Sequence, residues 1–224
     1  MEPARWSAVD EYYSNLLSPA DPALRAALEA SAAAGLPPIQ VSPNQGKLLM
    51  LLALARGART VLEIGTLGGY STIWLARGLS AGGRVVTLEC VARHAEVART
   101  NIVRAGLANV VEIVLGRALD TLPRLHAEAR GPFDLVFVDA NKEHMPDYFQ
   151  WALRLTARGS LIVLDNVVRG GEVLDGDGSD PNVLGVRRCM EMIAAEPRVS
   201  ATVVQTVGVK GYDGFALALV VADE

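Results

Sequence analysis

The chain has 224 residues, a formal net charge of −4 at pH 7 and a sequence pI of about 5.5. Half of the residues are hydrophobic and 21% are charged, which is typical of a globular protein and excludes a disordered chain. The acidic balance and the lack of a dense basic face argue against nucleic acid as a partner.

The N-terminal sequence and the number of cysteines indicate the cellular compartment of the protein. The first residues lack a basic start followed by an apolar stretch, so no signal peptide is expected. The apolar run Leu48–Ala55 is too short to span a bilayer. Cys90 and Cys189 are too few for a disulfide framework. We therefore expect a cytoplasmic protein without a membrane partner.

Helical stretches open the chain. They are predicted at about residues 5–17, 22–34 and 43–56. Asp21-Pro22 and Ser42-Pro43 each place a capping side chain before a proline, which is a typical helix start. Gly35, with Pro37-Pro38 behind it, ends the second helix.

From residue 59 onward, short apolar strands alternate with amphipathic helices. The strands are predicted at Thr60–Ile64, Arg84–Leu88, Val110–Leu115, Phe133–Val138 and Ser160–Leu164. This alternation predicts a parallel sheet covered on both faces, the doubly wound α/β class.

The C-terminal part departs from this rhythm. After a helix at about 182–195, two strand-like segments at 199–207 and 214–222 are separated by Gly208–Asp213. So short a connection permits an antiparallel pair but no parallel crossover. The prediction is a mostly parallel, Rossmann-like sheet with an antiparallel C-terminal strand.

We expect residues 1–224 to form a single domain, in which helices in residues 1–56 cover the site and residues 57–224 form the α/β core. Ligands of such sheets bind beyond the carboxyl ends of the strands, so residues that end strands are the candidates for a site.

The first strand runs into a glycine-rich turn, E-I-G-T-L-G-G-Y-S at residues 63–71. Glycines there allow a sharp turn and a close approach of a ligand. Leu67 stands where a dinucleotide fingerprint needs its second glycine, which disfavours NAD. Glu63 suits a cationic ligand better than a phosphate. The second strand ends at Glu89, which can accept hydrogen bonds from ribose hydroxyls.

Taken together, E-I-G-T-L-G-G-Y-S, V-V-T-L-E, F-D-L-V-F-V-D-A-N-K and L-I-V-L-D-N-V resemble the motifs of the cation-dependent O-methyltransferases, which include catechol and caffeoyl-CoA O-methyltransferases. The resemblance covers about residue 38 to the C-terminus. It implies the class I methyltransferase sheet with a reversed final strand, S-adenosylmethionine as methyl donor and a homodimer.

Carried over to this chain, the resemblance implies a set of residues around S-adenosylmethionine: Val41, Glu63, Gly65, Thr66, Ser71, Glu89, Gly116, Ala118 and Asp139. Glu63 would face the methionine end, Glu89 the ribose, and Gly116 and Ala118 the adenine. Catechol enzymes often have a serine at the position of Ala118, so one polar contact to the adenine is expected to be missing.

A metal site is predicted where neighbouring strands end. Asp139 follows one strand, and Asp165 and Asn166 follow the next. Oxygen ligands without Cys or His suit Mg²⁺, or Mn²⁺ or Ca²⁺, rather than zinc. The alternative is that these residues only form turns or caps. The resemblance assigns Lys142 the role of the base that takes the proton of the attacking hydroxyl.

The function predicted is a metal-dependent O-methyltransferase acting on a catechol-like vicinal diol. A metal-free methyltransferase and a non-catalytic S-adenosylmethionine-binding protein remain alternatives. Acceptor contacts are expected from residues 1–40, 167–181 and 208–214. The sequence shows no basic patch for a bulky anionic acceptor such as a CoA thioester, which favours a small aromatic diol.

Overall fold

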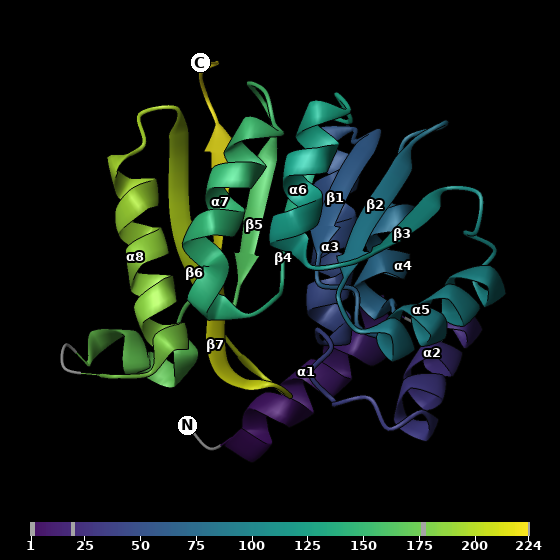
Figure 1. Ribbon diagram of the computed structural model, residues 1–224. Helices are drawn as coiled ribbons and strands as arrows, with labels where there is room; N and C mark the ends of the chain where they lie inside the picture. Colours follow the sequence, from purple (N-terminus) through teal and green to yellow (C-terminus); the bar gives the residue numbers. More distant parts are fainter. Residues whose placement is uncertain (1–2, 19–20, 176–177, 224) are drawn as a thin grey trace.

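A computed structural model of the chain describes residues 3–18, 21–175 and 178–223 (Figure 1). The helices are α1 (Pro3–Leu17), α2 (Pro22–Ala33), α3 (Pro43–Arg56), α4 (Tyr70–Arg77), α5 (Ala92–Arg104), α6 (Ala118–Ala127), α7 (Met145–Arg154) and α8 (Pro181–Ala195). The strands are β1 (Thr60–Ile64), β2 (Arg84–Glu89), β3 (Val111–Leu115), β4 (Leu135–Val138), β5 (Leu161–Asp165), β6 (Val199–Gly208) and β7 (Gly211–Val220). Short 3-10 helices lie at η1 (Lys142–His144) and η2 (Arg169–Leu174).

The strands form one sheet in the order β3-β2-β1-β4-β5-β7-β6. The pairs β3·β2, β2·β1, β1·β4 and β4·β5 are parallel, whereas β7 runs antiparallel to both β5 and β6. The predicted fold class, a mostly parallel doubly wound sheet with an antiparallel C-terminal strand, is therefore confirmed.

The connection between the last two strands differs from the prediction. Gly208 pairs with Gly211, so only Val209 and Lys210 lie outside the ladder, and the predicted separation by Gly208–Asp213 is wrong. Gly211 has a φ of +87°, whereas Val209 and Lys210 have no positive φ, which is the pattern of a type I turn followed by a glycine in the left-handed region. Tyr212 and Asp213 continue the strand, although the glycines and the aspartate of this segment are typical of a loop.

The predicted helix starts are confirmed by their caps. Asp21 Oδ1 accepts hydrogen bonds from the backbone N–H groups of Ala23 and Leu24, and Ser42 Oγ accepts one from Gln45. Each capping residue precedes a proline in the first turn of its helix. These bonds satisfy N–H groups that have no partner within the helix.

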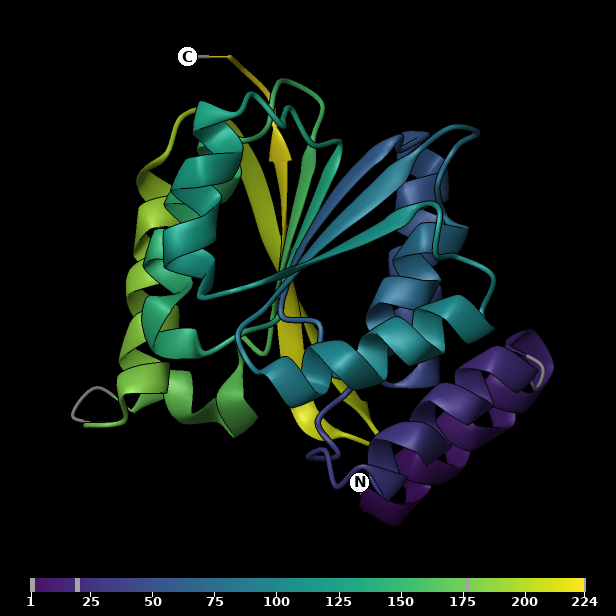
Figure 2. The same cartoon turned by 45° about the vertical axis from the view of Figure 1, so that its right-hand side comes forward.

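Both faces of the sheet are covered, and each face carries its own core (Figure 2). Side chains alternate along each strand, so Val136 packs towards α6, α7 and α8, whereas Phe137 packs towards the face that carries α3, α4 and α5. Both side chains are fully buried. The strands are thereby fixed from both sides, and so are the positions of the residues that follow them.

Helices α1 and α2 lie beyond the carboxyl ends of the parallel strands, α1 next to the tip of the β6–β7 hairpin and α2 beside α5 (Figure 1). Asp10 of α1 accepts a hydrogen bond from Val209 N at 2.9 Å and another from Asn44 Nδ2 at 3.0 Å. Lys210 Nζ donates to the carbonyl of Pro38 at 2.7 Å. Within the described ranges, no helix combines the length and the apolar character that a bilayer span requires.

Candidate active site

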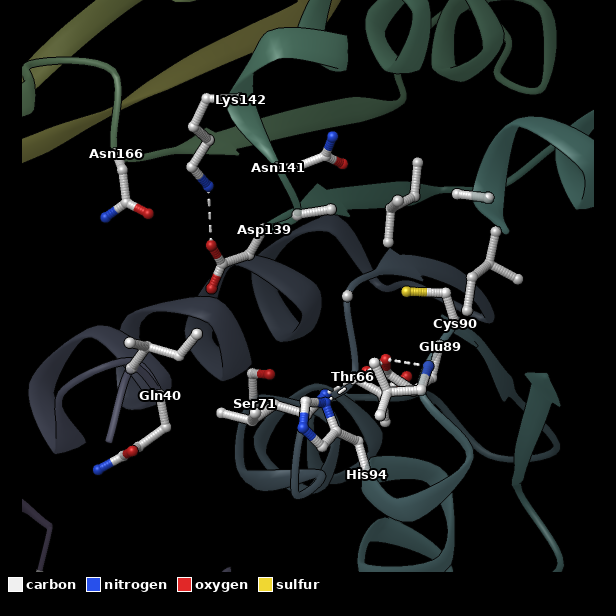
Figure 3. Close-up of a pocket in the computed structure, with 18 of the residues that line it drawn as sticks. Gln40, Thr66, Ser71, Glu89, Cys90, His94, Asp139, Asn141, Lys142 and Asn166 are labelled. Carbon is white, nitrogen blue, oxygen red and sulfur yellow. Dashed lines mark hydrogen bonds and ion pairs between the residues drawn. The ribbon is translucent and has the colours of Figure 1, made fainter. Parts of the chain in front are cut away.

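A cavity of about 720 Å³ lies at the edge of the sheet where β1, β2 and β4 end. Its wall includes most of the predicted site residues: Val41, Gly65, Thr66, Ser71, Glu89, Ala118, Asp139, Lys142 and Asn166. The other predicted residues, Glu63, Gly116 and Asp165, do not line the cavity, and Glu63 and Asp165 are buried. Figure 3 shows two ends of the cavity: Glu89, Cys90 and His94 lie together at one, and Asp139, Lys142 and Asn166 at the other. We call them the Glu89 end and the Asp139 end.

At the Glu89 end, one carboxylate joins two turns. Glu89 Oε2 accepts a hydrogen bond from Leu67 N at 2.8 Å, and Oε1 accepts one from Val91 N at 2.9 Å. His94 Nδ1 lies 3.6 Å from Oε1. A carboxylate has about four lone-pair positions, so Glu89 can still accept hydrogen bonds from two ligand hydroxyls. The site predicted for a ribose therefore has the acceptor capacity that a ribose needs.

Gly65 brings the two ends of the cavity together. It has a φ of +104°, and a Cβ atom at this position would collide with the backbone carbonyl of Asp139. The turn after β1 can therefore approach the end of β4 only because residue 65 has no side chain.

Glu63 lies behind the wall and is completely buried. Its carboxylate accepts hydrogen bonds from Ser71 Oγ at 2.6 Å, from Thr87 Oγ1 at 2.6 Å and from Thr72 Oγ1. Burial raises the pKa of Glu63 to about 7, against the lowering effect of the three hydroxyl donors. Because Ser71 lines the cavity, Glu63 can act on a ligand through that hydroxyl.

At the Asp139 end, Lys142 Nζ donates to Asp139 Oδ1 at 2.9 Å, and the lysine side chain is only 8% exposed (Figure 3). Helix α8 fixes the backbone of this lysine. Asn182 Oδ1 accepts from Lys142 N at 3.3 Å, and a Cβ atom on Gly185 would collide with the Lys142 carbonyl. The position of Lys142 thus depends on a helix some 40 residues further along the chain.

Asp165 and Asn166 complete the predicted metal ligands. Asp165 is 5% exposed, and its burial, followed by the charge of Asp139, raises the pKa of Asp165. Asn166 has a φ of +57°, and its backbone N–H donates to Asp165 Oδ1. No cluster of three His, Cys, Asp or Glu side chains suited to a metal occurs in the described part of the chain.

The donor set at the Asp139 end fits a hard divalent cation. Two carboxylates raise each other's energy when both are charged, and Lys142 offsets this repulsion only in part. Two carboxylates and one amide oxygen are ligands that Mg²⁺ accepts while it keeps positions for water or substrate. The set also lacks the sulfur and imidazole ligands that zinc prefers.

Several residues of the wall were not predicted individually from the sequence, although Ile39 and Gln40 lie within the segment 1–40 that was expected to contact an acceptor. Ile39 and Gln40 come from the segment before α3, and Tyr148 comes from α7. Tyr148 donates a hydrogen bond to Asn141 Oδ1 at 2.6 Å, and burial raises the pKa of this tyrosine to about 12. Asn141 lies within the motif D-A-N-K, so its position next to the site could have been inferred from the sequence. No sequence signal points to Tyr148.

Of the segments expected to contact an acceptor, two reach the cavity. Residues 1–40 contribute Leu28, Ser31, Ile39 and Gln40, and residues 167–181 contribute Arg169. No residue of 208–214 lines the cavity. Gly176 and Asp177 of the segment 167–181 lie outside the described residues.

Known proteins resemble this chain in sequence and in structure. A family model described as O-methyltransferase matches residues 16–220. A catechol O-methyltransferase of Mycobacterium tuberculosis is 59% identical over 212 residues, which cover 95% of this chain and 94% of that protein. The O-methyltransferase of Bacillus cereus in complex with SAH is 57% identical, with a TM-score of 0.97 and coverage of 98% of this chain and 100% of that one. An O-methyltransferase of Streptomyces achromogenes involved in tomaymycin synthesis, in complex with SAM, is 54% identical, with a TM-score of 0.96 and coverage of 99% and 100%.

The sheet order, the reversed β7 and the cavity at the strand ends define a Rossmann-like methyltransferase. The chain belongs to the O-methyltransferase family. This membership confirms the predicted enzyme class, an S-adenosylmethionine-dependent O-methyltransferase.

Proposed function

We propose that the protein transfers a methyl group from S-adenosylmethionine to one hydroxyl of a catechol-like small molecule, with a divalent cation at the Asp139 end. The observation that carries this proposal is the single cavity in which Asp139, Lys142 and Asn166 face the same space as Glu89. A relative at 59% identity is named as a catechol O-methyltransferase, which supports the acceptor class.

The methyl donor is proposed to lie along the turn after β1. Glu89 would accept hydrogen bonds from the ribose hydroxyls, while Gly116 and Ala118 would stand near the adenine. Val41, Gly65, Thr66 and Ser71 would surround the methionine part. Of the pair Gly116 and Ala118, only Ala118 lines the cavity.

The chemistry requires a deprotonated oxygen in line with the methyl group. Asp139, Asp165 and Asn166 would hold the cation, which when bound supplies positive charge that favours loss of the hydroxyl proton. Lys142 Nζ, in its neutral amine form, would accept that proton as the new O–C bond forms, and the electron pair of the breaking C–S bond stays on the sulfur. Tyr148 and Asn141, which are bonded to each other, would border the reacting groups.

The test is methyl transfer from labelled S-adenosylmethionine to a panel of catechols and matched monophenols, with and without a chelator. We expect catechols to be methylated to one predominant monomethyl ether, and chelation to stop turnover. Full activity with chelator present would favour the metal-free methyltransferase. Binding of the donor without transfer to any member of the panel would show that the acceptor belongs to another chemical class.

We also propose that the protein is a homodimer in the cytoplasm. Apolar side chains are exposed on α1 and β6, among them Leu16, Leu17 and Val203. Such side chains support association with a second copy. Both cysteines are free thiols, which suits a reducing compartment. Light scattering would measure the mass in solution.

A further inference from the structure

Arg169 differs from the other half-buried arginines of the chain. Arg56, Arg77 and Arg130 each pair with a carboxylate. Arg169 is half-buried, its Nε is buried without a hydrogen-bond partner, and its guanidinium forms no hydrogen bond or ion pair among the described residues. A partly desolvated charge is costly unless an opposite charge approaches it.

The backbone of Arg169 is also unusual. Its φ of +55° is a left-handed conformation that is unfavourable for an arginine and that a glycine adopts readily. Asp213 Oδ1 stabilises it by accepting hydrogen bonds from Val168 N and Arg169 N, both at 3.0 Å. The two following residues are glycines, yet position 169 carries a long cationic side chain. Strain retained next to a site points to a role in that site.

Arg169 belongs to the Asp139 end of the cavity. It lines the cavity and follows Asn166 by three residues, which span at most about 11 Å of chain. The other basic side chains near this end are engaged, because Lys142 is bonded to Asp139 and Lys210 to the carbonyl of Pro38. Among the described residues of this end, Arg169 is therefore the positive group available to a ligand.

We propose that Arg169 binds a carboxylate carried on the aromatic ring of the acceptor, so that the preferred substrates are anionic catechols. This inference rests on the proposed function. The guanidinium presents donors in a fixed fork that matches the two oxygens of a carboxylate. The diol of the same molecule would lie towards Asp139 and Lys142, and Asp213 would act as a positioning residue for the arginine.

The methionine part of the donor also carries a carboxylate that Arg169 could bind. The experiment therefore distinguishes the carboxylate of the acceptor from the carboxylate of the donor. At one pH and with Mg²⁺ present, kcat/KM is measured for 3,4-dihydroxybenzoate and for 3,4-dihydroxybenzyl alcohol, which share the ring and the diol but differ in charge. Affinity for S-adenosylhomocysteine is measured in parallel by calorimetry.

We expect the unaltered enzyme to prefer the anion, and Arg169→Met to lower kcat/KM for the anion by on the order of tenfold to a hundredfold. The same variant should change kcat/KM for the alcohol and the affinity for S-adenosylhomocysteine by less than about threefold. Arg158→Met, which removes the same charge at the opposite edge of the sheet, should keep the preference.

Three results would overturn the inference: no preference in the unaltered enzyme, an equal loss for both acceptors in Arg169→Met, or a loss of S-adenosylhomocysteine affinity that matches the loss for the anion. Turnover of the alcohol reports on the proposed function separately. If neither diol is methylated, it is the proposed function that fails.

Discussion

The two ends of the cavity are built in different ways. At the Glu89 end, a carboxylate at the end of β2 is held by backbone N–H groups of the turns after β1 and β2, within 22 residues of sequence. At the Asp139 end, Lys142 is held by α8, and the loop after β5 is held by Asp213 of β7. Those bonds join residues 40 to 45 positions apart.

The Glu89 end is therefore built from residues that are close together in the sequence, whereas the Asp139 end is assembled from elements that are far apart in the sequence. The Glu89 end forms when two adjacent βα turns are in place, which suits the constant part of a methyl donor. The Asp139 end needs α8, η1, η2 and β7 in their final positions. Substitutions in those distant elements can change the Asp139 end, where we propose that the acceptor binds, while the Glu89 end persists, and the first two predictions test this separation.

The largest effect is expected on removal of the cation that we propose for the Asp139 end. Asp165→Ala should reduce turnover by about 10³-fold or more, because positioning and charge stabilisation are lost together. Excess chelator should do the same to the unaltered enzyme, and Mg²⁺ should restore only the latter. Steady-state assays with labelled donor measure both.

Calorimetry should find the affinity of Asp165→Ala for S-adenosylhomocysteine within about twofold of normal, since the two ends are separate. Asp120→Ala, an exposed carboxylate of α6, is the matched control and should keep full turnover. Turnover that survives both chelation and Asp165→Ala would show that no cation takes part.

The next effect concerns Lys142, the proposed base. Lys142→Met should lower kcat on a catechol by on the order of 10²- to 10⁴-fold, the range for loss of a general base. Affinity for S-adenosylhomocysteine should not change, because Lys142 contacts Asp139 and lies away from Glu89. Single-turnover assays separate chemistry from product release. An unaltered single-turnover rate would remove Lys142 from the mechanism.

The same difference explains what could be predicted from the sequence. The Glu89 end lies in contiguous motifs, and strand periodicity places both Glu89 and Asp139 at strand ends. The parallel pairing of β4 with β5 then brings Asp139 and Asp165 to the same edge. These inferences need only local pattern and the general geometry of parallel sheets.

The contacts made by Asn182, Gly185 and Asp213 could not be predicted in this way. Each depends on how α8 or β7 packs against a loop far away in the sequence, and periodicity says nothing about that packing. The two-residue turn at Val209 and Lys210 was missed for a related reason, because pairing with β6 draws Tyr212 and Asp213 into a strand despite a loop-like sequence.

A third prediction concerns the pH dependence of stability at Glu63. Burial raises its pKa from 4.5 to about 7, so the folded protein binds this proton more tightly than the unfolded chain does. Protonated Glu63 therefore stabilises the folded state relative to the unfolded chain. This stabilisation is fully present below about pH 4.5 and is lost as the pH rises through about 7. The unaltered protein should therefore lose roughly 2–3 kcal/mol more than Glu63→Gln between pH 5 and pH 8.

Denaturant unfolding of the donor-free protein at several pH values measures this difference, and other titrating groups cancel in the comparison. Parallel profiles for the two proteins would show that Glu63 is ionised throughout.

The smallest effect is expected at Glu89, and it tests the other half of the comparison. Glu89→Gln keeps one oxygen acceptor but loses the charge, so affinity for S-adenosylhomocysteine should fall by about 1–2 kcal/mol. The KM of the acceptor at saturating donor should stay within about twofold. Glu112→Gln, an exposed carboxylate of β3, is the matched control. Normal affinity in Glu89→Gln would place the ribose elsewhere. A matching rise in acceptor KM would show that the two ends are coupled, because a change confined to the β1 and β2 turns would then have reached the Asp139 end.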